Sequence, residues 1–596
     1  MVISVFFRNF ALDFEKNGNK KGMNKQKWIY VLAGLLLAWQ VSFAQEELPV
    51  IDMSADRVTL YPQRMDLSGK ETLFDMLQLF PNHFTEGYET WLTDYEIRID
   101  NGPYGGDMRV LLNEMKASRI LKIQISDEPG VAKGLTGTKG CVDVFLLPLE
   151  EGAHGTLGAE ASTNLKVTPF AELRYGSEKT DILANASYNY RYTNYKENNG
   201  DPIHQQYANF HMVNKFSEKD QLVTYITQNF TNSFVRPEKL SAASGFTSPY
   251  VRTNDFNFVG QLRNYHFFTP KTFLMSAVVY MNGTSPKITY HDDPQDLTYR
   301  TDEKLNVFAA VEELNTTFFD ALNLMAGVEA DYVMSDNLFH YNDMQSFTNS
   351  RSDVFNADAY VELDYTYKQW RFTIGDRVRY YRYHNCDSVN DIFIPMYQET
   401  LQHRCHNLAH ASVVYTPHRQ HQIQLAYARK YKGPQYRLNQ FDETPFNEVK
   451  LAYTFSRPNV TASLNTYFDN QKAPNGITTN WLRVDASAYY RIKFFTVTGG
   501  IASYAALGSD KIYRVTLRIN PVFNLPYGMR VQARYEYMFD RNIDSLYAFN
   551  YGEAQFTKTW GPWGKNGLTF DTYIQWHTDF DNKFYGITTL GLRLNM

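Results

Sequence analysis

The residues with the clearest capacity for chemistry are histidines and cysteines around one long predicted loop. The group comprises His384, Cys386, His403, Cys405, His406 and His410. Imidazole nitrogens and thiolate sulfurs are ligands that soft and borderline metal ions prefer, and the two strands of one hairpin could bring them together. Three interpretations are open: a disulfide between Cys386 and Cys405, which we expect first, unpaired structural cysteines, and a metal site that includes His384, His403 and His406.

Sequence signatures of common enzyme classes are missing. The chain contains no G-x-S-x-G nucleophile elbow, no H-E-x-x-H zinc motif and no G-x-x-x-x-G-K-[ST] phosphate-binding loop. Serine, histidine and acidic side chains on facing strands could still assemble a site that spacing in sequence does not reveal. We therefore expect no catalytic residues, no resident cofactor and no enzymatic activity, and we keep a barrel enzyme only as the last alternative.

The composition narrows the class of fold that must position these residues. Of the 596 residues 15% are aromatic, with 43 Tyr and 41 Phe, although the mean hydropathy is -0.44. Disordered chains are poor in aromatics, and a polytopic helical membrane protein is excluded because the only long apolar run is residues 28–39. The net charge of -5 does not support nucleic-acid binding. A transmembrane β-barrel explains both numbers, because its alternate residues face lipid and a polar interior.

The N-terminal segment has the pattern of an export signal. Residues 25–44 combine a basic start, an apolar run and small residues at Ser42 and Ala44. This predicts a secretory signal peptide over residues 1–44, with cleavage after Ala44. Met23 is a plausible alternative start of translation, since residues 1–22 precede the signal pattern.

From Gly155 to Met596 the chain alternates with period 2, which is typical of long β-strands. Residues 531–539 carry Val, Ala, Tyr, Tyr and Phe at odd positions and Gln, Arg and Glu at 532, 534 and 536. Short turns such as 417–420 alternate with long connections such as 386–402. We therefore predict about 22 antiparallel strands, with Tyr and Phe on the lipid face and its edges, and Arg, Asn, Asp and Ser lining the inside.

Residues 68–150 have the pattern of a small mixed α/β domain. Ser68 and Glu71 predict a capping box ahead of a helix that Pro81 stops. We also expect strands at 96–100, 120–126 and 141–147, and a second helix near 107–118. A barrel of about 22 strands has a lumen wide enough to need such a domain as a plug.

This order of elements resembles the plug and barrel of TonB-dependent outer-membrane transporters. Four segments carry the resemblance: ETLFDMLQLFP at 71–81, Ile99 to Pro103, Ile120 to Ile125 followed by Pro129, and the strand with Gly137, Gly140, Val142 and Val144. The chain departs from the family pattern in its shorter plug and in the missing Arg-Gly segment before the turn at 99–103. The motifs cover about 80 residues, and the barrel matches by architecture.

The resemblance implies an all-β transmembrane barrel of about 22 antiparallel strands with a small α/β N-terminal plug domain inside the lumen. The expected order is a signal peptide (1–44), a periplasmic leader (45–67), the plug (68–150) and the barrel (155–596). It further implies a place in the outer membrane of a Gram-negative bacterium, in contact with outer-membrane lipid. The implied function is ligand-gated active uptake of a scarce solute, such as an iron chelate, haem or cobalamin, driven through TonB.

The resemblance also suggests which residues meet TonB and the ligand. The TonB-contact candidates form the extended stretch after the cleavage site, although an unstructured leader is an equal interpretation: Glu47, Leu48, Pro49, Val50, Ile51 and Asp52. The ligand-contact candidates lie in turn-rich plug loops: Asn101, Gly102, Pro103, Tyr104, Gly105, Gly137 and Gly140. The alternative function is a non-transporting barrel with a structural, adhesive or complex-forming role. No residue identifies the small-molecule ligand.

Overall fold

The structure of the protein is a computed structural model. It describes residues 49–65, 67, 71–80, 95–100, 102–104, 111–112, 115–127, 130–132, 140–163, 165–192, 202–235, 250–290, 297–341, 347–390, 396–432, 444–472, 478–492, 494–507, 513–527, 529–542, 545–563, 567–578 and 584–595. Within this described part of the chain, no helix is long and apolar enough to cross a membrane.

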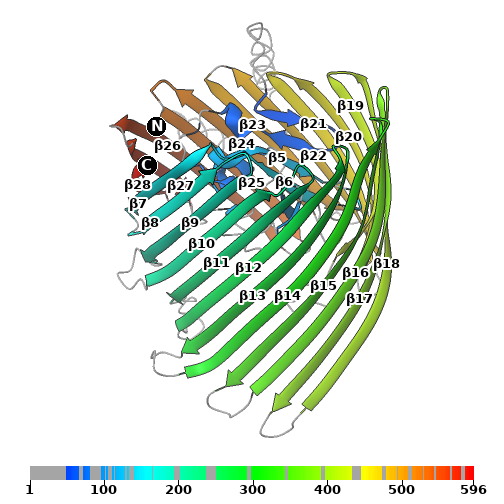
Figure 1. The fold of residues 1–596 in the computed structure, drawn as a ribbon, viewed down its shortest axis with the longest axis horizontal. Helices are drawn as coiled ribbons and strands as arrows, with labels where there is room; N and C mark the ends of the chain where they lie inside the picture. The colour runs from blue at the N-terminus through cyan, green and yellow to red at the C-terminus, as the bar shows by residue number, and fades with distance from the viewer. Residues whose placement is uncertain are drawn as a thin grey trace. The chain divides into compact units, whose positions relative to one another are not determined.

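Most of the chain forms one closed barrel of antiparallel strands, shown in Figure 1. The strands are β7 (Gly152–Ser162), β8 (Val167–Gly176), β9 (Thr180–Tyr192), β10 (Pro202–Lys215), β11 (Asp220–Val235), β12 (Tyr250–Thr269), β13 (Thr272–Tyr290), β14 (Leu297–Phe318), β15 (Leu322–Tyr341), β16 (Phe347–Tyr367), β17 (Trp370–Asn390), β18 (Met396–His418), β19 (His421–Lys432), β20 (Thr444–Arg457), β21 (Val460–Lys472), β22 (Thr478–Ile492), β23 (Phe495–Ala506), β24 (Tyr513–Leu525), β25 (Met529–Asn542), β26 (Ser545–Trp563), β27 (Leu568–Thr578) and β28 (Phe584–Asn595). The last strand closes on the first, where Leu592 lies opposite Ala159. The predicted barrel of 22 strands is confirmed, and it begins at Gly152, three residues before the predicted start.

The period-2 pattern of the sequence becomes the two faces of the barrel wall. On β20, Leu451 and Tyr453 point outward and are exposed, whereas Ala452 and Thr454 point inward and are buried. Successive side chains of a strand point to opposite faces, so an alternating sequence gives the wall an apolar outside. The outer side of the wall is therefore suited to contact with lipid.

The prediction that Tyr and Phe keep to the outer face and its edges is wrong for part of the wall. Tyr381, Tyr383, Tyr467 and Tyr489 are all fully buried. Tyr381 and Tyr383 pack with Val333 and Val354, and Tyr489 joins the core of the inner sheet described next. A tyrosine can lie inward where its ring packs against a neighbour. The hydroxyls of Tyr467 and Tyr489 also have polar partners there, in the Asp127 carboxylate and the Val50 N–H.

Six short strands form a separate mixed sheet, which we call the plug sheet. They are β1 (Ile51–Met53), β2 (Val58–Leu60), β3 (Tyr95–Ile99), β4 (Gly102–Pro103), β5 (Ile120–Ser126) and β6 (Gly140–Leu146), in the order β1-β2-β5-β6-β3-β4. The predicted strands at 96–100, 120–126 and 141–147 are confirmed to within one residue at each end. Among the described strand pairs of this sheet, β3 and β6 alone run parallel.

The prediction that residues 45–67 form a leader outside the plug has to be corrected. Residues 51–60 form β1 and β2, and β2 pairs with β5 inside the plug sheet. Val50, Ile51 and Leu60 are almost completely buried. The short apolar alternation in this stretch therefore belongs to a sheet edge that only pairing with β5 completes.

The described helices of the plug are short. They are η1 (Pro62–Arg64), α3 (Leu73–Leu77) and η3 (Ala117–Arg119), while Leu111 and Leu112 are also helical. The predicted capping box is shifted: Thr72 caps α3, with its Oγ1 accepting from the Asp75 N–H and the Asp75 carboxylate accepting from the Thr72 N–H. Ser68 lies outside the described residues. The helix that begins after Thr72 buries Leu73, Met76 and Leu77 in the plug core.

Candidate functional site

The plug sheet, together with the turns and short helices that flank it, is held by polar side chains from strands spread around the barrel. These contacts come from β12, β16, β17, β19, β21, β22, β24 and β25. A sheet bonded to so many strands of one closed wall lies within the lumen. The apolar core of the plug also includes Tyr489 and Val522 of the barrel, so packing and polar contacts both fix it.

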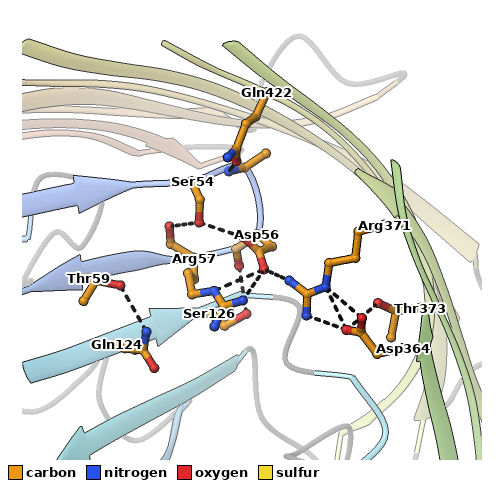
Figure 2. A network of polar contacts seen from close by, with 11 residues as sticks. Ser54, Asp56, Arg57, Thr59, Gln124, Ser126, Asp364, Arg371, Thr373 and Gln422 are labelled. Atoms are coloured by element: carbon orange, nitrogen blue, oxygen red, sulfur yellow. Dashed lines mark hydrogen bonds and ion pairs between the residues drawn. The ribbon is translucent and has the colours of Figure 1, made fainter. Parts of the chain in front are cut away.

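One contact network lies at the turn between β1 and β2, drawn in Figure 2. The Asp56 carboxylate accepts hydrogen bonds from Ser54 Oγ at 2.7 Å and from an Arg371 nitrogen of β17 at 2.8 Å. The same Arg371 donates two bonds to Asp364 of β16, with its Nε at 2.8 Å from Oδ2. Arg371 therefore bridges a plug carboxylate and a wall carboxylate, a geometry that suits the planar guanidinium.

The charges at this turn favour an ionised Asp56. Burial by itself would raise the pKa of Asp56, but Arg57 and Arg371 outweigh it and hold that pKa well below its usual range. The backbone supports the same position, because Ser126 Oγ donates to the Asp56 carbonyl at 2.9 Å. The Ala55 N–H donates to Gln422 of β19 at 3.1 Å. The turn is thus tied to β17 and β19 at once.

A second network surrounds Asp127 at the end of β5. Tyr95 Oη of the plug and Tyr467 Oη of β21 both donate to its carboxylate, at 2.5 and 2.7 Å. Lys430 of β19 donates to the Asp127 carbonyl at 3.1 Å and pairs with Glu448 at 2.6 Å. Burial, and then the charge of Asp127, raise the pKa of Tyr95 well above its usual range, so its hydroxyl remains a donor.

A third contact fixes the start of a glycine-rich plug loop. The Val131 N–H donates to Glu362 Oε2 of β16 at 2.6 Å. The carbonyl of Val131 accepts from Arg377 of β17 at 3.3 Å. Gly130 has a φ of +82°, and a Cβ there would meet the Glu362 carboxylate. Glycine is therefore needed at 130 both for the backbone conformation and for the close approach to the wall.

A fourth contact holds the turn after β3. Arg263 of β12 donates to the Ile99 carbonyl at 2.9 Å, and Tyr265 Oη donates to the Asp100 carbonyl at 2.9 Å. A Cβ on Gly102 would overlap the Arg263 guanidinium. The turn that resembles the family motif is thus packed against the barrel wall.

One half-buried plug carboxylate, Glu96, has a pKa that burial and neighbouring charges raise to near neutral. Glu96 of β3 lies 3.7 Å from the Arg98 guanidinium, which also approaches Asp143 at 3.6 Å. Burial, reinforced by the nearby charge of Glu329, raises the pKa of Glu96 to about 7 despite Arg98. Its charge, and with it the balance of charges between plug and wall, therefore changes within the physiological range.

The stretch expected to contact TonB is partly integrated into the plug. Val50 and Ile51 are buried, and the Val50 N–H donates to Tyr489 Oη of β22 at 3.3 Å. Asp52 is exposed on β1. The interpretation of this stretch as an unstructured leader is therefore wrong for Val50 to Asp52. Glu47 and Leu48 lie outside the described residues.

The loops expected to contact a ligand are anchored where the structure describes them. Gly102 and Pro103 form β4, Tyr104 packs edge-on against Tyr225 of β11, and Gly140 begins β6. The ring centroids of that tyrosine pair are 5.5 Å apart. Asn101, Gly105 and Gly137 lie outside the described residues. Ligand contact by this set stays a prediction.

The prediction of a disulfide between Cys386 and Cys405 is wrong. Cys386 lies opposite Glu399, and Cys405 lies opposite Tyr380, six residues away along β17. Six residues of extended strand correspond to about 20 Å, far beyond the Cα separation of about 7 Å that a disulfide permits. Both cysteines are free thiols. The antiparallel register of β17 and β18 decided this, and the sequence did not reveal that register.

The three histidines proposed as metal ligands do not come together. His384 lies opposite Leu401, and His403 lies opposite Arg382 and contacts Tyr380 Oη at 2.9 Å. His406 is an odd number of residues from His403 on β18, so it points to the opposite face of the wall. Among the residues that the structure describes, His384 alone of the three belongs to a group of metal-type ligands, with Cys386 and Glu399.

The residues that join plug and wall were mostly not found in the sequence. Asp56 and Arg371 are 315 positions apart, and Val131 and Glu362 are 231 apart. The sequence indicated only that charged residues alternate with apolar ones along the strands and so face the lumen. Four arginines of the last strands pair with acids of the wall or with the plug: Arg514 with Asp540, Arg534 with Glu553, Arg593 with Asp571, and Arg518 with the Gln78 carbonyl.

Comparisons with known proteins place this geometry among solved structures. The sequence matches no protein-family model and no curated protein. The structure is similar to the alcaligin outer-membrane receptor FauA from Bordetella pertussis, with a TM-score of 0.64 and 10% identity over 93% of this chain and 99% of that one. It is also similar to the ferric-catecholate import receptor Fiu from E. coli K12 in its closed form, with a TM-score of 0.67 and 10% identity over 91% and 97%.

A third similar structure is the FrpB iron transporter from Neisseria meningitidis (F3-3 variant). Its TM-score is 0.65, with 11% identity over 92% of this chain and 100% of that one. At such low identity the likeness establishes the fold. The chain has the fold of these receptors and transporters over nearly its full length, as the resemblance of its plug segments predicted.

Proposed function

We propose that this protein is a TonB-dependent-receptor-like uptake protein of the outer membrane of a Gram-negative bacterium. In this role it admits a scarce small solute, such as an iron chelate, haem or cobalamin, through a lumen that the plug closes. The observation that carries the proposal is the anchoring of the plug sheet by polar and ionic side chains of strands around the barrel. Supporting it, similar folds belong to proteins named as an alcaligin receptor, a ferric-catecholate receptor and an iron transporter.

Polar anchoring suits a plug that must be released and then return. Each ionic contact can be exchanged for water at a modest net cost, whereas a continuous apolar interface would lose its whole burial energy at once. Ligand binding and partner binding can therefore each shift the plug between two states by their difference in affinity for those states.

The residues proposed to contact TonB are close in sequence to one of the contacts that hold the plug, the Asp56–Arg371 ion pair. Residues 49–50 lead into β1, which pairs only with β2 among the described strands and forms the edge of the plug sheet. The next turn holds Asp56 against Arg371. A partner that pulls on residues 47–52 would load β1 first and the Asp56–Arg371 ion pair next. Release would then proceed from that edge of the sheet.

Uptake measurements test this proposal. Cells with and without the protein, each with and without TonB, would be given labelled ferric chelates, haem and cobalamin. We expect uptake of at least one solute that requires both proteins. Uptake that needs the barrel but not TonB, or no uptake of any solute, would contradict energised transport and favour a non-transporting barrel.

A binding measurement tests the TonB contact separately. The purified periplasmic part of TonB would be captured on the full-length protein and on a variant without residues 47–52. We expect binding to the first and loss of binding to the second. Equal binding to both would place the contact elsewhere, and binding to neither would overturn the coupling.

A further inference from the structure

Three metal-type ligands meet on the outward face of β17 and β18, apart from every plug contact. His384 and Cys386 lie two residues apart on β17, and Glu399 of β18 lies opposite Cys386. Their ligand atoms all lie within 4.8 Å of one another. His384 Nε2 is 2.8 Å from Glu399 Oε1 and 3.5 Å from Cys386 Sγ.

These separations are close to those of a tetrahedral ion. Typical Zn–S and Zn–N bonds of about 2.3 and 2.05 Å at a tetrahedral angle put sulfur and nitrogen about 3.6 Å apart. The sulfur and the imidazole nitrogen already have that spacing. Nitrogen and oxygen ligands would be about 3.3 Å apart. His384 Nε2 and Glu399 Oε1 are 2.8 Å apart, so the Glu399 side chain, which is 55% exposed, has to move back from the imidazole.

Two neighbours support the ligands from behind. The other imidazole nitrogen, His384 Nδ1, lies 3.9 Å from the Asp353 carboxylate of β16. A carboxylate on that side favours the tautomer with its proton on Nδ1, which leaves Nε2 free to bind a metal. Tyr397 Oη donates to Cys386 Sγ at 3.7 Å and so holds the sulfur in place.

The charges around this cluster select the class of ion. Arg351 lies opposite Cys386, and Arg382 is two residues from His384, so both share this outward face. A site flanked by two arginines is a poor trap for Ca²⁺ or Mg²⁺, which need several oxygen ligands. Thiolate and imidazole ligands instead form coordination bonds with transition metals.

We infer that His384, Cys386 and Glu399 form a binding site for one divalent transition-metal ion of the Zn²⁺ type. Water completes the fourth position, because His384 and Glu399 are open to solvent. Binding releases the Cys386 thiol proton to solvent. The ion links β17 to β18 beyond the outward aromatic pair Phe355 and Tyr380, toward the ends of these strands at 390 and 396.

The site is independent of the proposed uptake path. Tyr381 and Tyr383, which alternate with His384 on β17, are buried on the opposite, inward face of the wall. An ion at His384 therefore lies outside the lumen. Its role is to pin the outer end of one of the longest hairpins of the barrel, and it is not cargo.

Cobalt spectroscopy on the purified full-length protein tests this site. Co²⁺ alone is the probe, because a thiolate ligand gives a charge-transfer absorption that carboxylate or imidazole ligands do not. We expect one Co²⁺ per chain with that absorption, displaced by Zn²⁺. C386S should abolish the absorption and weaken Zn²⁺ binding at least tenfold, and D353N should weaken it by about tenfold.

C405S is the matched control, because Cys405 is an exposed thiol on the same outward face of β18. It should leave the absorption and the stoichiometry unchanged. Heat-modifiable gel mobility, which reports barrel closure, establishes that each variant is folded. A folded wild type without a thiolate–cobalt absorption, or an absorption lost in C405S and kept in C386S, overturns the site. H384Q and E399Q must each lower the affinity, and equal affinity in either removes that residue from the ligand set.

Discussion

At the scale of single residues, charge placement explains how the plug is held. Asp56 shares one guanidinium with Asp364, and Glu362 accepts from the backbone of Val131. In each case a side chain of the barrel wall makes a hydrogen bond or ion pair with a polar group of the plug. Such contacts give position and reversibility more than stability, since each replaces hydrogen bonds to water.

The first prediction concerns the Asp56 anchor. D56N removes the ionic bond to Arg371, and we expect the plug to unfold more easily by roughly 1–2 kcal/mol, a value reduced because Arg371 is 36% exposed. The measurement is a urea titration of the purified protein with proteolysis of the plug as readout. D52N, an exposed carboxylate on β1 of the same hairpin, is the control and should match the wild type. Equal midpoints for wild type and D56N would show that this ion pair does not hold the plug.

The second prediction is the pH dependence that Glu96 imposes. Its pKa in the folded plug is raised to about 7, above its ordinary 4.5. The folded state therefore prefers the protonated acid, so this contribution is fully present below about pH 4.5 and is lost as pH rises through about 7. The low pKa of Asp56 acts only below 3.8 and leaves this window unaffected.

Urea titrations of the plug between pH 4.5 and 8 measure that dependence. The wild type should lose plug stability as pH rises, and E96Q should flatten the profile. E150Q replaces an exposed carboxylate between the plug sheet and the barrel and should retain the wild-type slope. A slope that survives in E96Q would assign it to another group.

At the scale of elements, the strands carry the strongest information. The alternation that predicted the faces of the wall is local, because the side-chain period of a strand is 2 whatever its partner. Strands β5 and β6 were located to within one residue for the same reason, since each is a short apolar run bounded by polar or turn residues. The predicted helix cap at Ser68 was wrong by four residues: Thr72 caps α3, and the helix that follows buries Leu73 and Met76 in the plug core.

The third prediction tests the outward face of one strand. Leu451 is exposed in the middle of β20, opposite Leu425 of β19. L451R should cost about 2–4 kcal/mol of folding free energy in lipid, because it places a charge near the bilayer midplane. Folding into vesicles at graded urea concentrations measures it. L451F keeps an apolar side chain and should fold like the wild type; an equally mild effect of L451R would mean that this face does not meet lipid.

At the scale of the whole molecule, a wide barrel is closed by a small sheet. A 22-strand barrel leaves a lumen that side chains of the wall alone do not fill. The plug sheet fills part of it and bonds to strands on several sides. Closure is therefore a property of two units together, and neither the barrel nor the sheet has it alone.

The fourth prediction follows from that closure. In planar lipid bilayers the full-length protein should pass little current, whereas a variant without residues 49–150 should form a large, steadily open channel, because its lumen lacks the plug. D56N should open more often than the wild type and less than the deletion. A deletion variant as tight as the full-length protein would show that other parts of the chain seal the barrel.

The sequence by itself determined the class of fold, the number of barrel strands, the faces of those strands and most of the plug strands. These depend on periodicity and short-range rules, which each segment carries within itself. Tertiary structure decided which residues meet: it separated Cys386 from Cys405, joined Cys386 to His384 and Glu399, drew β1 into the plug and set Asp56 against Arg371. Those pairings depend on strand register and on contacts between residues hundreds of positions apart, and a change of register by one residue would reverse every side chain of a strand.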